Sequence, residues 1–294
     1  MNNISKNLKC IATASIAAVI GIAVINIFGQ ESIGKDKTKA EYNAKEKGFC
    51  TNNNWSSDDN FSFSELREMT IPATGTINVD GSQNGGIGVK GEDRSDVLIR
   101  ACVQAWSKSD ADAKAVAANI KINTSGQVKA ENPSGDKNWS VSYQILVPRS
   151  TNLNLTAHNG GISISGTDGS AEFQTQNGGL NISNLSGNVK GRTTNGGVHV
   201  SLAGTSWKGT GLDIQTTNGG VNLSMPQNYS AHVETGTVNG GFNSDISSLS
   251  IEKTDENGRR RSAKISTDIN GGGAPIRVTT TNGGVRITSR DDKE

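Results

Sequence analysis

The sequence predicts an all-β protein: a β-solenoid like a right-handed parallel β-helix, preceded by a β-rich cap containing one short helix. Three observations indicate this fold. The tripeptide Asn-Gly-Gly recurs along the chain, most copies are followed by an apolar-polar-apolar triplet, and glycine is abundant (36 of 294 residues) while proline is rare (5 residues). Alternation with a period of two is typical of a strand with one buried face. A unit that returns along the chain is typical of a solenoid.

The tripeptides are predicted to be the turns between the two strands of each coil. They begin at eight positions: Asn84, Asn159, Asn177, Asn195, Asn218, Asn239, Asn270 and Asn282. Asparagine tolerates the left-handed backbone region and glycine supplies a positive φ without steric cost, so we expect these turns to stack in one column. A stack of hairpins is the competing interpretation, because Asn-Gly is also the strongest short hairpin signal. The repeat unit of roughly 18 residues favours the coil, because it is long enough to go once around a solenoid.

The alternation also predicts which side chains face inward. The expected core is formed by the apolar members of the repeats: Ile162, Ile164, Phe173, Leu180, Ile182, Val198, Val200, Ile214, Val221, Leu223, Val285 and Ile287. The position two residues before each asparagine is mostly threonine and should also face inward, with its hydroxyl bonded to the next coil: Ala157, Thr175, Thr193, Thr216, Thr237, Asp268 and Thr280. An inward threonine column disfavours an ice-binding surface. Apolar residues after the glycines disfavour a calcium-binding β-roll.

Residues 1–29 are predicted to be an export signal or a signal anchor. Lys6 and Lys9 precede an apolar run over residues 10–28, the layout of a secretory signal. Cleavage near Gly21 and Ala23 would remove the run, whereas an uncleaved run is just long enough to anchor the chain in a membrane. Residues 30–60 lack an apolar period and are predicted to be a flexible tether. The rest of the chain is exported under both interpretations.

Residues 61–150 are predicted to form an N-terminal cap region that holds the first tripeptide, and residues 151–290 the repeat domain. Strand patterns cover residues 97–106, 121–129 and 139–147. A helix is expected to begin after Ser109 and run through Ala118, because Ser or Asp satisfies the free N–H groups at a helix start. We expect this helix to cover the open edge of the first coil.

Two of the three cysteines, Cys50 and Cys102, lie in the predicted exported part of the chain. Because exported proteins meet an oxidising environment, the two are candidates for a disulfide. The alternative is a buried Cys102 and a free Cys50.

The residues predict no catalytic, cofactor-binding or metal-binding site. A net charge of +1 disfavours a nucleic-acid partner. The three histidines, His158, His199 and His232, have no second ligand at metal-binding spacing. The acids Asp168, Glu172, Asp213 and Glu234 are scattered, but a carbohydrate-active β-helix enzyme stays an alternative because a site needs only two or three residues. The basic run at residues 259–261 is a solvated loop tip or a contact for an anionic envelope partner.

Three stretches resemble a known family. They are FSELREMTI at residues 63–71, WSVSYQILVPRSTNLNLTAHNGGISISG at residues 139–166, and GGGAPIRVTTTNGGVRI at residues 271–287. Each is similar to bacterial adhesin-like β-strand-repeat proteins with a DUF4097-like domain of unknown function, and the resemblance covers residues 61–289. It implies a β-helix-like fold and an envelope location, without known catalytic residues or an established ligand.

The sequence therefore predicts an exported, noncatalytic β-solenoid of the bacterial cell envelope, in the periplasm, the outer membrane or at the cell surface. Its expected role is adhesin-like binding or scaffolding, with an envelope polysaccharide or protein as partner. A membrane contact is expected only through the N-terminal segment, if that segment is not cleaved. The alternatives are the carbohydrate-active enzyme and a regulatory component of an envelope-stress system.

Overall fold

The protein is described from a computed structural model, which describes residues 48–50, 61–249 and 263–290. The chain forms two compact units, residues 1–44 and residues 45–294. The first unit, with the predicted signal, lies outside the described residues. So do most of the predicted tether and the basic run at residues 259–261.

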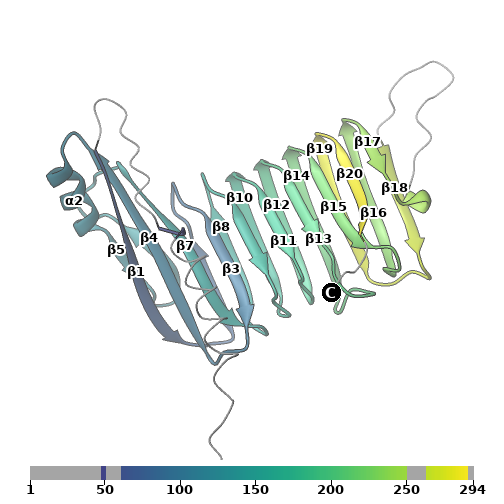
Figure 1. Ribbon diagram of the computed structural model, residues 1–294, viewed down its shortest axis with the longest axis horizontal. Helices are drawn as coiled ribbons and strands as arrows, with labels where there is room; N and C mark the ends of the chain where they lie inside the picture. Colours follow the sequence, from purple (N-terminus) through teal and green to yellow (C-terminus); the bar gives the residue numbers. More distant parts are fainter. Residues whose placement is uncertain (1–47, 51–60, 250–262, 291–294) are drawn as a thin grey trace, which may run out of the picture. The chain divides into compact units, whose positions relative to one another are not determined.

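Two ten-stranded sheets make up the second unit (Figure 1). Sheet A has, in spatial order, β1 (Phe61–Pro72), β4 (Asp96–Ser107), β7 (Trp139–Pro148), β3 (Ile87–Glu92), β9 (Ile162–Ser165), β11 (Leu180–Ser183), β13 (Val198–Ser201), β15 (Val221–Pro226), β20 (Val285–Arg290) and β17 (Phe242–Ser244). Sheet B has β18 (Ala263–Ile269), β16 (Ala231–Asn239), β19 (Pro275–Asn282), β14 (Gly211–Asn218), β12 (Asn188–Asn195), β10 (Ala171–Asn177), β8 (Asn152–Ala157), β2 (Thr76–Asp80), β6 (Val128–Glu131) and β5 (Lys121–Asn123).

The repeats stack in register, and the predicted β-solenoid is confirmed. In each regular coil a strand of sheet B passes through Asn-Gly-Gly into a strand of sheet A. Successive coils pair in parallel, with Leu180 opposite Val198 in sheet A and Asn177 opposite Asn195 in sheet B. Like positions therefore lie above one another, which excludes the hairpin stack. The right-handed crossover stays a prediction.

The core lies between the two sheets and follows the predicted alternation. All twelve core residues predicted from the repeats are buried, each with an exposed fraction of 3% or less. They belong to one continuous cluster that extends from Ile77 to Ile287. Because β2 pairs with β8 and β3 with β9, the repeat at Asn84 belongs to the same two sheets as the repeats after residue 150.

The coils do not follow one another in chain order at either end of the sheets. The last repeat of the chain, β19 and β20, lies between the repeats β14–β15 and β16–β17. At the other end β2 and β3 lie between β8–β9 and the strands β6 and β7. The last repeat has a complete apolar-polar alternation on both sides of its tripeptide, so both of its strands can pair along both edges. The irregular segments lie at the outer end of the two sheets. There β17 has only three residues, and β18 runs antiparallel to β16.

One tripeptide, at Asn270, is not a corner of the solenoid, and this part of the prediction is wrong. It follows the antiparallel strand β18, so it turns the chain back toward β19 at the opposite end of the strands. Asn270 has a φ of +47°, and its side chain donates to the carbonyls of Gln227 and Tyr229. The related prediction that Asp268 faces inward is also wrong, because its side chain is 66% exposed.

The N-terminal region contains the predicted helix, α2 (Asp110–Asn119). Ser109 is its N-cap, accepting a hydrogen bond from the Asp112 amide at 3.1 Å. The helix packs on β4 and β1. The expectation that it covers the open edge of the first coil is wrong, because β2 and β3 pair there with β6 and β7, and β1 and β5 form the sheet edges at this end. The strand predicted over residues 121–129 is a hairpin of two short strands, β5 and β6. In the part of the chain that the structure describes, no helix has the length and apolar character needed to cross a membrane.

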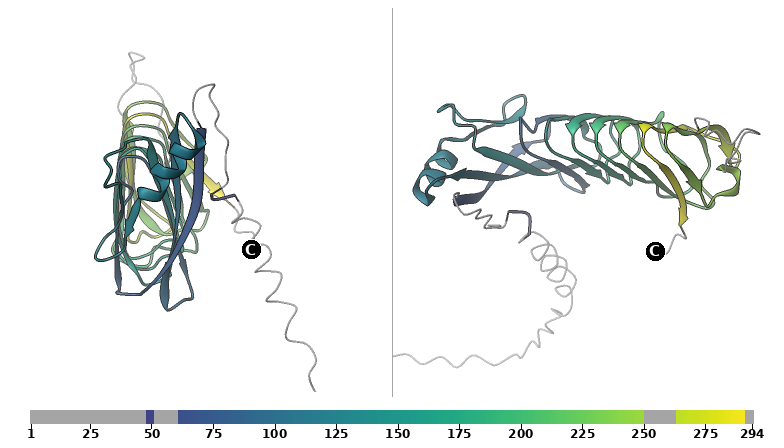
Figure 2. Two further views of the ribbon diagram at one scale, coloured as in Figure 1. Left: turned by 90° about the vertical axis from the view of Figure 1, so that its left-hand side faces the viewer. Right: turned by 90° about the horizontal axis from the view of Figure 1, so that it is seen from above.

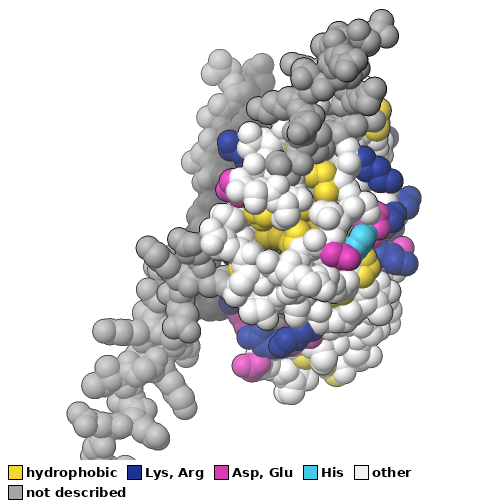
Figure 3. Space-filling view, turned by 90° about the vertical axis from the view of Figure 1, so that its right-hand side faces the viewer, with side chains coloured by type: hydrophobic (Ala, Val, Ile, Leu, Met, Phe, Trp, Pro, Cys, Tyr) yellow, Lys and Arg dark blue, Asp and Glu magenta, His cyan; other side chains and the backbone are white. Residues whose placement is uncertain are grey.

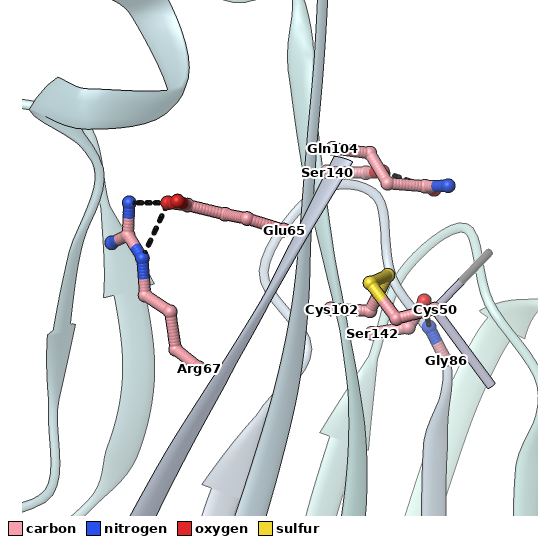
Figure 4. The surroundings of a disulfide bond; sticks show 8 residues. All are labelled: Cys50, Glu65, Arg67, Gly86, Cys102, Gln104, Ser140 and Ser142. Atoms are coloured by element: carbon pink, nitrogen blue, oxygen red, sulfur yellow. Dashed lines mark hydrogen bonds and ion pairs between the residues drawn. A yellow bond between two sulfur atoms is a disulfide. The ribbon is translucent and has the colours of Figure 1, made fainter. Parts of the chain in front are cut away.

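A disulfide joins Cys50 to Cys102 on β4 (Figure 4). Cys102 alternates with the inward residues Ala101 and Val103 and so belongs to the outer face of sheet A, yet it is only 3% exposed. The bond holds residues 48–50 against this outer face.

Candidate functional site

The asparagines of seven tripeptides form one continuous ladder of amide hydrogen bonds. Each side-chain Nδ2 donates to the Oδ1 of the neighbouring coil, over distances of 2.8 to 3.0 Å. In spatial order the ladder contains Asn84, Asn159, Asn177, Asn195, Asn218, Asn282 and Asn239. The ladder gives each asparagine a structural role at the surface of the corner.

A second, buried ladder lies directly behind it. The predicted threonine column points inward, and each Oγ1 donates to the carbonyl of the first corner glycine in the neighbouring coil at 2.7 or 2.8 Å. Its members are Thr175, Thr193, Thr216, Thr280 and Thr237, all 5% exposed or less. These bonds give each buried threonine hydroxyl a hydrogen-bond partner.

Replacing Asn195 with alanine tests the asparagine ladder. The change removes one bond to Asn177 and one from Asn218, so we expect a loss of about 1–2 kcal/mol in the free energy of unfolding. Thermal and urea denaturation measure it. Asn181→Ala is the matched control, because this exposed asparagine stands two residues after the corner glycines and is not a member of the ladder. Equal effects of the two substitutions would contradict a structural role for the ladder.

The outer face of sheet B has a column of charges of alternating sign. In register across five adjacent strands stand Glu172, Lys190, Asp213, Arg277 and Glu234. Arg277 and Glu234 form an ion pair at 2.7 Å. Chain order hides this column, because β19 lies between β14 and β16.

Beside this column a groove of about 730 Å³ crosses the outer face of sheet B. We call it the polar groove. Hydroxyl, amide and charged groups project into it: Gln174, Arg192, Thr194, Gln215, Thr217, Glu234, Lys264, Arg277, Thr279 and Thr281. Glu234 is the one acid among its described lining residues. Groups that donate and accept hydrogen bonds are thus presented on strands about 4.8 Å apart, an arrangement suited to an extended polar ligand.

A smaller cavity of about 390 Å³ adjoins the polar groove and contains two carboxylates, Glu172 and Asp213. Lys190 stands between them in register. Two strand spacings place their Cα atoms roughly 9–10 Å apart. Glycosidases use a pair of carboxyl groups that flank the scissile bond, so the presence of two acids in one cavity bears on the enzyme alternative.

The fold brings acids to His232, although the sequence shows no second ligand at metal-binding spacing beside it. Its Nδ1 is 2.7 Å from the Asp268 carboxylate, and its Nε2 is 3.8 Å from Glu234. Asp268 comes opposite His232 through the antiparallel pairing of β16 with β18, which spacing along the chain does not reveal. Figure 3 shows charged side chains of both signs around a histidine at this end of the molecule. The described residues contain no cluster of three ligands suited to a metal ion.

The other two histidines lie on other coils than His232. His158 lies between β8 and the corner of its coil, and His199 lies on the outer face of β13, where its Nδ1 is 3.2 Å from Asn222 Nδ2.

Two buried tyrosines have raised pKa values. Burial raises the pKa of Tyr229 to about 12. Burial, with a smaller contribution from the nearby Asp80 charge, raises the pKa of Tyr143 further. Both phenols therefore stay protonated at neutral pH, which makes neither a general base.

A second groove, of about 490 Å³, lies on the outer face of sheet A. Its lining is largely apolar and includes Phe49, Gly88 and Ile162. Phe49 precedes the disulfide cysteine, so the disulfide holds part of this groove's wall. Sequence periodicity does not reveal this groove, since Phe49 comes from outside the repeats.

Comparison with known proteins identifies the family. The family model described as Toastrack DUF4097 matches residues 54–288. No curated protein matches the chain. Among solved structures, a "putative cell adhesion protein" from Clostridium sporogenes is 12% identical, covering 78% of this chain and 100% of its own, with a TM-score of 0.40. A "putative adhesin" from Bacteroides fragilis is 10% identical, covering 78% and 97%, with a TM-score of 0.38.

Proposed function

The chain belongs to the Toastrack DUF4097 family, and we propose that it is an exported, noncatalytic β-solenoid of the bacterial cell envelope. In this proposal the polar groove is an adhesin-like binding surface for an envelope polysaccharide. The observation that carries it is the groove itself, in which hydroxyl, amide and guanidinium groups repeat across the adjacent strands β10, β12 and β14. Polysaccharides offer repeated hydroxyl groups, which can donate to and accept from such side chains.

Two features support the export of the chain. The sequence begins with a basic and apolar segment typical of a signal. The Cys50–Cys102 disulfide is of the kind that forms and persists in oxidising compartments. Two of the compared solved structures are described as adhesion proteins, which is compatible with a binding role.

Binding to bacterial envelope polysaccharides tests this proposal. Purified full chain is incubated with peptidoglycan sacculi and, separately, with lipopolysaccharide, and the bound fraction is measured by co-sedimentation and by biolayer interferometry. Replacing both Gln174 and Arg192 with alanine is expected to weaken binding at least tenfold, because each lost polar contact is worth about 1 kcal/mol. Both side chains are exposed, so the melting temperature should not change.

Arg286→Ala is the matched control, since Arg286 is an exposed arginine on the outer face of sheet A. It should bind like the unmodified chain. A chain that binds neither polysaccharide, or a groove variant that binds as well as the control, would refute the proposed ligand surface.

The carbohydrate-active enzyme stays a second candidate because of Glu172 and Asp213. A glycosidase built on this pair would release reducing sugar from the same polysaccharides, and Glu172→Gln and Asp213→Asn would each abolish that release. Binding without release of reducing sugar is the result expected under the noncatalytic proposal.

A further inference from the structure

Strand β1 is a long edge strand. It pairs with β4 over all twelve of its residues, and no other described strand pairs with it. Figures 1 and 2 show it at one end of the sheets. Along its other edge the backbone N–H and C=O groups face away from sheet A, and such a row is a template for a further strand. Natural edge strands are blunted by shortness, bulges, charges, proline or a covering helix. β1 is long, pairs without a bulge and contains no lysine. Its charged residues, Glu65, Arg67 and Glu68, are of both signs, and its proline is the last paired residue.

Apolar side chains are exposed along the same strand. The described residues contain three large exposed apolar side chains. Two of them, Phe61 at 54% and Leu66 at 47%, lie on β1; the third, Val238 at 59%, lies on β16. Leu66 stands near the middle of β1, where a pairing strand would cover it.

The sequence of β1 is complementary to itself when two copies run antiparallel about Leu66. Residues equally far from Leu66 then face each other, so Glu65 lies opposite Arg67 of the partner subunit. Phe63 lies opposite Met69, and Phe61 opposite Ile71. Cross-strand pairs of opposite charge and of apolar side chains stabilise a sheet, whereas like charges opposite each other destabilise it.

Neighbouring registers lose this complementarity. A pairing centred on Glu65 places that carboxylate opposite its own copy, and a pairing centred on Arg67 does the same with the guanidinium. The register centred on Leu66 is therefore favoured over both by charge.

The charged pair is already positioned at the edge. Arg67 Nε donates to Glu65 Oε1 at 2.7 Å (Figure 4). Arg67 Nη2 donates to the Ala117 carbonyl near the end of α2 at 2.8 Å. The contact with α2 fixes the guanidinium beside the strand. Glu65 uses Oε1 in this pair, which leaves Oε2 as an acceptor toward a second chain.

We propose that β1 joins two copies of this chain into a twofold-symmetric dimer, by antiparallel pairing centred on Leu66. Sheet A of one copy then continues into sheet A of the other. The Leu66 side chains meet at the symmetry axis, and each Glu65 pairs with Arg67 of the partner subunit. A twofold interface closes after two copies, so growth stops at the dimer.

Sedimentation velocity on the purified full chain tests the dimer. We expect a species of twice the chain mass of 30.7 kDa at micromolar concentration. Leu66→Lys places two ammonium groups at the axis and should raise the dissociation constant at least 100-fold, leaving a monomer. Val238→Lys is the matched control and should leave the dimer intact. The melting temperature, measured below the concentration at which the chain associates, should be unchanged in both variants because both side chains are exposed.

The symmetry makes a sharper test possible. Because residue 66 lies opposite itself, Leu66→Glu should also give a monomer, whereas an equimolar mixture of Leu66→Lys and Leu66→Glu should form a heterodimer. Differently tagged chains and co-purification detect it. A monomeric unmodified chain at 100 μM, or a dimer that persists in Leu66→Lys, would overturn the proposal. So would chains that grow beyond two copies, which would indicate pairing of β1 with the opposite end of the solenoid.

Discussion

Replacing Gly196 with alanine is expected to destabilise the protein by about 3 kcal/mol or more, at the upper end for an overpacked site. A Cβ at this position would lie 2.0 Å from the Gly178 oxygen and 2.5 Å from its carbonyl carbon. Both atoms belong to the backbone of the neighbouring coil, so no side-chain rotation relieves the clash. The coils would have to separate at the corner, which would also break the Thr193 and Asn195 bonds to that coil.

Gly197→Ala is the matched control for this experiment. A Cβ at Gly197 would have only the Gly220 oxygen nearby, at an ordinary contact distance of 3.7 Å. We therefore expect a change of less than 1 kcal/mol. Urea denaturation of both variants measures the difference, and equal losses at the two glycines would contradict the close stacking of corners.

The structure gives a different reason from the sequence for the need for glycine at position 196. The sequence predicted that the corner glycines adopt backbone angles closed to other residues. Gly196 has no positive φ, and neither do the first glycines of the other stacked corners except Gly283, at +159°. The requirement comes instead from the stack, because each first glycine lies against the carbonyl of its neighbour: Gly160, Gly178, Gly196, Gly219, Gly240 and Gly283.

Replacing Phe173 with alanine is expected to cost about 3–5 kcal/mol, the range for truncating a buried aromatic side chain. Phe173 is 2% exposed in the middle of the solenoid. Its register partner on the next strand is Gly191, and a Cβ there would lie 2.2 Å from the Phe173 ring. The ring therefore occupies the volume that a side chain at Gly191 would fill. Urea and thermal denaturation measure the loss.

The same contact allows a rescue experiment. Gly191→Val alone should destabilise, because its side chain collides with the ring. Combined with Phe173→Ala it should recover about 1–2 kcal/mol, since the methyl groups fill part of the cavity. A double variant no more stable than the sum of the two single losses would show that the residues do not share one space.

The local features of the fold could be predicted from the sequence. Strand positions, inward and outward faces and the helix start after Ser109 all follow from residue types within a few positions of each other. The period of two assigns Ile162 and Ile164 to the core and Ser163 to the surface, and both assignments are confirmed. The corner ladders were also predictable, because Asn and Thr return at constant offsets in each regular coil.

The candidate site was less predictable. The polar groove and the charge column require β10, β12, β14, β19 and β16 side by side, in that order. Sequence order would have placed Glu234 next to Asp213, whereas Arg277 stands between them. The position of Asp268 beside His232 likewise depends on the antiparallel strand β18, which the repeat pattern does not predict.

By itself, the sequence determined what each coil is: two strands, an Asn-Gly-Gly corner, and a face for the core. Only the tertiary structure decided which coils are neighbours and which strands are left at the edges, such as β1 and β18. The physical reason is that the regular coils all present nearly the same hydrogen-bonding edge. Local residue pattern therefore favours no particular neighbour, and the order is chosen by the burial and pairing of the whole chain.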